Sequence, residues 1–82
     1  MKEIAYRPAA RRALSRMTLS LAQRIVSKVQ DYAADPASQA NNVKALQGRP
    51  GIRLRVGDWR VIMEDGVVLD VIDVGPRSSI YR

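Results

Sequence analysis

Two short segments on either side of Gly57-Asp58 constrain the fold of this chain more than any other feature. Residues 52–56 (Ile-Arg-Leu-Arg-Val) alternate apolar and basic side chains with a period of two, which is typical of a half-buried strand. Residues 59–63 (Trp-Arg-Val-Ile-Met) return after the two-residue turn, so the pattern predicts a β-hairpin with one apolar face. The other face of this hairpin carries three basic side chains: Arg53, Arg55 and Arg60.

The predicted register places Arg55 directly opposite Arg60, although like charges that face each other across a ladder destabilise it. We therefore expect these arginines to hold an anion. A phosphate is the leading candidate, because a guanidinium group forms forked hydrogen bonds to phosphate and stays charged. The alternative is a solvated sheet face or a docking surface for an acidic partner.

The composition agrees with an anionic partner. The 82 residues are enough for a single domain, which we place at residues 1–82, and 46% hydrophobic residues support a packed core. Eleven of the fourteen basic residues are arginine, and the net charge of +6 favours a polyanion or an acidic protein as partner. The chain has neither cysteine nor histidine, which excludes thiolate and imidazole chemistry. We expect no metal and no cofactor.

The sequence carries no signal for a membrane or for secretion. No apolar run approaches the roughly 20 residues that a membrane span requires. Lys2 is not followed by the apolar segment of a secretory signal. We therefore expect a cytoplasmic protein that does not bind membranes.

The first half of the chain predicts one strand and two helices. Residues 2–7 form a short strand, and Pro8 suits the first turn of a helix, where its missing N–H costs nothing. A second, longer helix starts at Thr18 or Ser20 and ends at Asp35-Pro36. Apolar residues at helical spacing mark the buried sides of both helices: Ala10, Ala13, Leu14, Met17, Leu21, Ile25, Val29 and Tyr32.

The second half predicts a meander of strands. Small polar residues at 35–43 form a loop, and residues 44–51 lead through a turn into the hairpin. The strand at 59–64 ends at Asp65-Gly66, a strong signal for a type I′ turn. Residues 67–74 are nearly all apolar and are predicted to form a central strand, broken after Val74 by Gly75-Pro76.

The turn at Asp65-Gly66 predicts that Ile62 lies opposite Leu69. With this register Asp70 falls on the face that the helices cover, where it requires a partner or a bulge. Continuing the alternation past the last strand places Arg77 on the open face beside the other arginines.

The order of elements predicts an α+β fold: an N-terminal strand, a helical hairpin and a three-stranded antiparallel meander. We expect the helices to pack on one sheet face, the one that carries the apolar side of the hairpin. The arginines then lie on the open face.

Three segments resemble the RelE family of bacterial toxins, the RelE-like branch of the RelE/ParE superfamily. They are Lys44-Ala-Leu-Gln-Gly, Ile52-Arg-Leu-Arg-Val-Gly-Asp-Trp-Arg-Val-Ile and Asp73-Val-Gly-Pro-Arg-Ser-Ser-Ile-Tyr-Arg. The family has K-x-L-x-G, R-x-R-x-G-D-[YW]-R and V-G-x-R-x-x-x-Y-R in the same order, so the resemblance spans the whole chain. It implies a type II toxin with a RelE-like fold, an endoribonuclease that arrests growth by cutting messenger RNA, in many members in the ribosomal A site. It also implies an acidic antitoxin that binds the toxin in a hetero-oligomer.

The resemblance implies roles for five residues. Arg53 falls where many members have a catalytic Lys or Arg. Arg60 matches the arginine that stabilises the scissile phosphate, and Arg77 matches the arginine assigned to the leaving oxygen. Tyr81 matches a tyrosine that orients the RNA or stacks on it. Arg55 matches a supporting basic position, and we predict that Lys44, Arg55 and Arg82 bind the RNA.

For two of these residues a structural role is the alternative to a catalytic one. Arg77 would be a charge at the end of the strand that pairs with Asp73, and Tyr81 would pack against the sheet and anchor the C-terminal segment. Trp59 lies on the apolar face and is predicted to belong to the core.

Two positions depart from the family pattern. Gly51 stands where some members have a lysine, so a proton-transfer role there is missing, and Pro76 occupies a position that is often basic or histidine.

The related ParE branch has the same fold but targets DNA gyrase, and it usually lacks the full set of catalytic-type residues. A gyrase inhibitor that acts by binding is therefore the alternative function.

RNA cleavage of this type requires the 2′-hydroxyl to attack its own phosphate in line with the departing 5′-oxygen. Arginines orient the backbone and neutralise the developing charge, but they stay protonated and are poor bases. We therefore expect the rate enhancement to be mostly positional and electrostatic. The general base stays open between Arg53, which its neighbours would have to activate, and Lys44.

Overall fold

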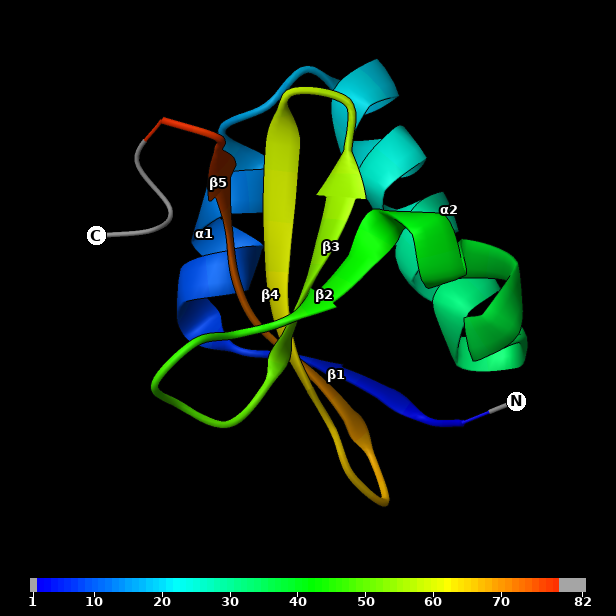
Figure 1. The fold of residues 1–82 in the computed structure, drawn as a ribbon. Coiled ribbons are helices and arrows are strands. Elements are labelled where there is room, and N and C mark those ends of the chain that lie inside the picture. The colour runs from blue at the N-terminus through cyan, green and yellow to red at the C-terminus, as the bar shows by residue number, and fades with distance from the viewer. Residues whose placement is uncertain (1, 79–82) are drawn as a thin grey trace.

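The computed structural model describes residues 2–78 of the 82-residue chain, which form one sheet with helices packed on one of its faces (Figure 1). The strand order in the sheet is β1-β5-β4-β3-β2. The strands are β1 (Ile4–Tyr6), β2 (Val43–Ala45), β3 (Ile52–Val56), β4 (Trp59–Asp65) and β5 (Leu69–Pro76). β1 runs parallel to β5 at one edge, and every other neighbouring pair is antiparallel. The α+β architecture predicted from the sequence is confirmed.

Two α-helices follow β1, as the sequence predicted. Pro8 occupies the first turn of α1 (Pro8–Ser15). Thr18 is the N-cap of α2 (Leu19–Ala34), because its hydroxyl accepts a hydrogen bond from the backbone N–H of Leu21 at 3.3 Å. A 3₁₀ helix, η1 (Pro36–Asn42), replaces the loop predicted at residues 35–43. No helix in the described part of the chain is long and apolar enough to cross a membrane.

The hydrophobic core lies between the two α-helices and the sheet. Ile25, Leu54 and Met63 are fully buried there, and Trp59 packs against the margin of the core. The core cluster of buried residues consists of Ala10, Ile25, Val29, Tyr32, Ala33, Leu54, Val56, Val61, Met63, Leu69, Val71 and Val74. The apolar face of the hairpin is therefore the covered one, as predicted.

The register predicted for the last hairpin is wrong. Ile62 lies opposite Asp73 rather than Leu69. A type I′ turn requires positive φ at both central residues, and neither residue of Asp65-Gly66 has it. The connection instead spans residues 66–68, which slides β5 along β4.

A β-bulge determines where Asp70 lies. The register between β4 and β5 shifts after Ile62, and Ile72 is the extra residue without a partner across the ladder. Asp70 consequently lies on the sheet face away from the core, where its carboxylate pairs with the Arg7 guanidinium at 3.3 Å. The sequence predicted that Asp70 would need either a polar partner or a bulge, and the structure contains the bulge.

β5 continues through Pro76, although Gly75-Pro76 was predicted to break the strand. β1 pairs only with Leu69–Val71, so the end of β5 has a partner strand on one side only. The missing N–H of a proline is tolerated in such an edge position. Pro76 lies opposite Trp59.

Two glycines in the connection between β2 and β3 have left-handed backbones. Gly51 has a φ of +115°, and a Cβ atom added to it would lie 2.9 Å from the backbone oxygen of Met63. Gly48 has a φ of +75°, and a Cβ atom there would meet nothing within 4 Å. Of these two glycines, only Gly51 combines a left-handed backbone with a close approach to other backbone atoms.

We expect Gly51→Ala to lower the free energy of unfolding by about 3 kcal/mol, because the new Cβ adds a backbone clash to the left-handed strain. Gly48→Ala should lower it by about 1–2 kcal/mol, since only the strain applies. Urea denaturation of both variants measures the difference. Equal losses in the two variants would contradict the close approach at Gly51.

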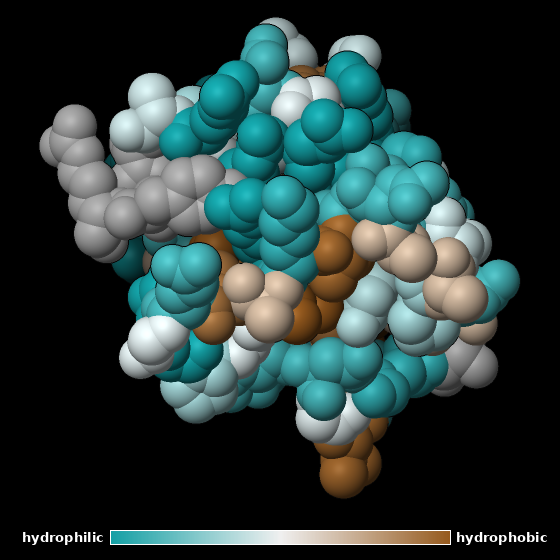
Figure 2. Space-filling view, viewed as in Figure 1, coloured by the Kyte–Doolittle hydropathy of each residue, from teal (hydrophilic) through white to brown (hydrophobic). Residues whose placement is uncertain are grey.

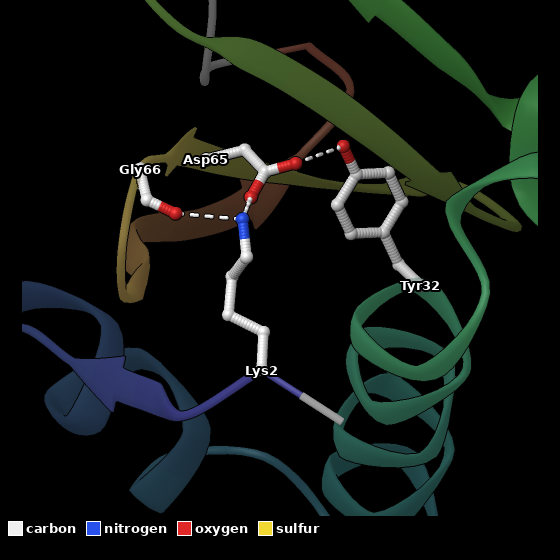
Figure 3. Close-up of polar contacts among 4 residues, drawn as sticks. All are labelled: Lys2, Tyr32, Asp65 and Gly66. Carbon is white, nitrogen blue, oxygen red and sulfur yellow. Dashed lines mark hydrogen bonds and ion pairs between the residues drawn. The ribbon is translucent and has the colours of Figure 1, made fainter.

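A polar cluster of Lys2, Tyr32 and Asp65 joins α2 to the β4–β5 connection and the N-terminal segment (Figure 3). The Tyr32 hydroxyl donates to the Asp65 carboxylate at 2.8 Å, and Lys2 pairs with the same carboxylate and donates to the Gly66 carbonyl at 2.6 Å. The hydrogen bonds from Lys2 and Tyr32 lower the pKa of Asp65. Burial, helped by the hydrogen bond and charge of Asp65, raises the pKa of Tyr32 to about 12.

The raised pKa of Tyr32 predicts a loss of stability at high pH. Above pH 10 the unfolded chain releases the tyrosine proton before the folded chain does, so the free energy of unfolding falls as the pH rises toward 12. Tyr6 adds to this fall, because burial raises its pKa too. We expect Tyr32→Phe to be about 1–2 kcal/mol less stable than the wild type at pH 7. In urea titrations this gap should shrink as the pH approaches 12, and a gap independent of pH would contradict the assignment.

Candidate phosphate-binding site

Basic side chains from three strands form a block on the sheet face opposite the helices. Lys44 of β2 lies opposite Arg53 of β3, and Arg55 of β3 lies opposite Arg60 of β4. Residues two apart along a strand share a face, so all four cations lie on the same side of the sheet. In Figure 2 hydrophilic side chains gather over the upper part of this face, toward the β3–β4 turn.

A hollow of about 220 Å³ opens between these side chains. Its lining consists of Asn41, Asn42, Lys44, Arg53, Arg55 and Arg60. Four of these residues are cations, and no described carboxylate lines the hollow. An anion inside it would relieve the repulsion between the like charges.

The guanidinium of Arg60 is fixed by the turn of its own hairpin. Nη1 donates to the backbone oxygen of Gly57 at 2.9 Å and to that of Trp59 at 3.0 Å. A guanidinium has five N–H donors, and the remaining three make no hydrogen bond to another described residue. Arg60 therefore presents a preorganised fork to an anion in the hollow.

The side chain of Arg55 is oriented by η1. Its Nη2 donates to Oδ1 of Asn42 at 3.3 Å, and Nδ2 of Asn42 donates to Oε1 of Gln39 at 3.4 Å. Gln39 is buried. The sequence prediction missed Asn41 and Asn42, because they reach the site only through η1 and the pairing of β2 with β3.

Strand β2, also missed by the prediction, brings Lys44 to the site. Val43 was expected to end a loop and residues 44–45 to lead into a turn, but all three residues pair with β3. The backbone N–H of Leu46 donates to the Gly51 oxygen at 3.0 Å and closes the connection. The tight contact of Gly51 leaves no room for the lysine that some RelE-like toxins have at this position.

The remaining predicted site residues lie at or beyond the end of β5. Arg77 is exposed, does not line the hollow, and donates its backbone N–H to the Asp58 oxygen at 2.9 Å, beside the β3–β4 turn. Within residues 2–78 it forms no ion pair with Asp73. Tyr81 and Arg82 lie outside the described residues. The roles of these three residues stay predictions.

The model of one protein family matches almost the whole chain. It is described as the ParE toxin of type II toxin-antitoxin system, parDE, and it matches residues 4–81. Comparison with curated proteins gave no significant match.

Chains from solved toxin–antitoxin complexes have the same fold. The archaeal RelE–RelB complex from Pyrococcus horikoshii OT3 matches with a TM-score of 0.77 and 20% identity over 95% of this chain and 97% of that chain. The RelB–RelE complex from Methanococcus jannaschii gives a TM-score of 0.73 and 19% identity over 95% of each chain. The intact E. coli RelBE complex matches with a TM-score of 0.71 and 22% identity over 93% of this chain and 96% of that chain. At these identities the likeness establishes the fold, and it confirms the RelE-like fold predicted from the sequence.

Proposed function

This chain belongs to the ParE toxin family of type II toxin–antitoxin systems, and within that family we propose, in line with its resemblance to RelE-like toxins, that it is an endoribonuclease that cleaves messenger RNA in the ribosomal A site. The observation that carries the proposal is the hollow lined by Lys44, Arg53, Arg55 and Arg60 on the open sheet face. A site with four cations and two side-chain amides suits a phosphodiester. We further propose that the toxin acts in the cytoplasm and that an acidic antitoxin binds it, as the solved complexes of the same fold suggest.

The scissile phosphate occupies the hollow in this proposal. The ribose 2′-oxygen attacks the phosphorus, the bond to the 5′-oxygen breaks, and the products carry a 2′,3′-cyclic phosphate and a 5′-hydroxyl. Arg60 binds the non-bridging oxygens through its fixed fork, and Arg55 adds a second guanidinium. Both stabilise the negative charge that grows in the transition state, at no cost of reorganisation.

Proton transfer is assigned to Lys44 and Arg53, which lie opposite each other on β2 and β3. The 2′-hydroxyl must lose a proton and the 5′-oxygen must gain one. A guanidinium stays protonated in proteins, whereas an ammonium group gives up a proton more readily, so Lys44 is the stronger candidate for the base. The proposal keeps Arg77 at the leaving oxygen and Tyr81 as the residue that orients the RNA, as the family resemblance implies.

A gyrase inhibitor that acts by binding is the second candidate, and the description of the matching family as ParE toxins favours it. In that case the basic block is a contact surface and no bond is cleaved. The two candidates differ in what happens to RNA and DNA in the cell.

Mapping the 5′ ends of messenger RNA after a brief pulse of toxin expression separates them. The ribonuclease proposal expects new ends with a free 5′-hydroxyl inside coding regions and no DNA-damage response. Unchanged messenger RNA together with a DNA-damage response would overturn it in favour of the gyrase inhibitor. Co-expression of the antitoxin serves as the control, since it should abolish either effect.

A further inference from the structure

A second basic hollow, which we call the α2 groove, lies between α2 and the β3–β4 turn. Its volume is about 460 Å³. The lining residues are Arg24, Lys28, Asn42, Arg55, Val56, Gly57 and Asp58. Arg55 and Asn42 line both this groove and the candidate phosphate-binding site, so the two hollows adjoin at these side chains.

Arg24 lies beside the turn of the hairpin. A Cβ atom at Gly57 would lie 3.3 Å from Nη2 of Arg24, so the guanidinium lies directly against the turn backbone. Arg24 and Lys28 are four residues apart on α2 and therefore share one face of the helix. Within residues 2–78 Arg24 and Lys28 form no ion pair. Asp58 is the one described carboxylate in the lining, and it is not paired with either cation.

We propose that the α2 groove binds phosphates of the same RNA strand whose scissile phosphate lies in the first hollow. The strand then runs from the open sheet face, over Arg55, to Arg24 and Lys28. This inference rests on the proposed function, because the RNA reaches the groove only by continuing from the first hollow. It adds a subsite that fixes the direction in which the flanking nucleotides leave the cleavage site.

The lining of the groove favours a polynucleotide over a protein segment. A protein interface is anchored by apolar or aromatic side chains in its buried centre, whereas nucleic-acid interfaces are polar and strongly positive. The single apolar residue of the lining, Val56, is only 3% exposed. Three cations and an amide make up most of the rest, and this is the chemistry of a phosphate backbone.

Binding of uncleavable RNA to the purified toxin tests the subsite. The probes are 2′-O-methyl oligouridylates, which lack the nucleophile, as a dinucleotide and as a hexanucleotide. We expect Arg24→Gln combined with Lys28→Gln to weaken hexanucleotide binding on the order of tenfold and to reduce the salt slope by about 1.4, at roughly 0.7 for each lost phosphate contact. Dinucleotide binding should stay unchanged.

Arg11→Gln combined with Arg12→Gln is the matched control, because it removes the same charge from the exposed side of α1. It should change hexanucleotide affinity less than twofold. Arg24→Lys combined with Lys28→Arg keeps both charges and should retain wild-type binding, which separates electrostatic effects from folding effects.

Each outcome assigns the failure to one proposal. If the Arg24 and Lys28 double variant binds the hexanucleotide like the control while the wild type binds RNA, the subsite is overturned and the proposed function stands. If the wild type binds neither oligonucleotide, the subsite is overturned, whereas the mapping of messenger RNA 5′ ends decides the proposed function separately. If the double variant loses affinity for the antitoxin and none for RNA, the groove belongs to a protein partner and the subsite is again overturned.

Discussion

Replacing Arg60 by alanine is expected to abolish growth arrest and to slow RNA cleavage by a factor on the order of 10²–10³. This guanidinium is fixed by the carbonyls of Gly57 and Trp59 before RNA arrives, so little ordering entropy is lost when it binds a phosphate. Its remaining donors stabilise the additional negative charge that develops on the phosphate oxygens in the transition state. The loss should therefore fall on kcat more than on KM.

The measurement is cleavage of a ribosome-bound messenger RNA by purified toxin, together with colony formation after induction. Arg11→Ala is the matched control, since it removes an exposed arginine from α1 and should keep full activity. Arg60→Lys keeps the charge but loses the forked geometry, and its activity should lie between those of the wild type and Arg60→Ala. Full toxicity of a folded Arg60→Ala protein would exclude the assigned role.

The hairpin was predictable from the sequence because its information is local. The alternation in residues 52–56 and 59–63 matches a period of two on both sides of a two-residue turn, and only one register satisfies both segments. That register fixes Arg55 opposite Arg60. Most of the basic block follows from this short stretch of chain.

The pairing of β4 with β5 could not be read from its turn, since burial of side chains decides it. Leu69, Val71 and Val74 all face the core. The step from Val71 to Val74 is three residues, an odd number that an uninterrupted strand cannot place on one face. A bulge at Ile72 removes the conflict. The sequence prediction took its register from the Asp65-Gly66 turn motif and did not use this odd spacing.

The parts of the site that the sequence prediction missed depend on contacts between distant segments. β2 has only three residues, which are too few for a periodic pattern. It forms because its backbone pairs with the otherwise unpaired edge of β3. Asn42 reaches Arg55 only through that pairing and through η1. Arg24 on α2 is an ordinary exposed helix residue until the packing of α2 places it against the hairpin turn.

Leu54→Ala is expected to cause the largest loss of stability, about 3–4 kcal/mol in the free energy of unfolding. Leu54 is fully buried and lies opposite Val43 and Val61 in the sheet, so truncation leaves a cavity that rigid strand pairing cannot close. For a domain of this size the melting temperature should fall by roughly 15–25 °C.

Val67→Ala is the matched apolar truncation, because Val67 is 96% exposed, and it should change the stability by less than about 0.5 kcal/mol. Thermal melts and urea titrations of the two variants measure the contrast. Leu54 stands between Arg53 and Arg55 in β3, and burial of the leucine is what turns both arginines to the opposite face. Equal stability losses at Leu54 and Val67 would show that the faces of β3 are misassigned, and the basic block would then lose its place on the open side of the sheet.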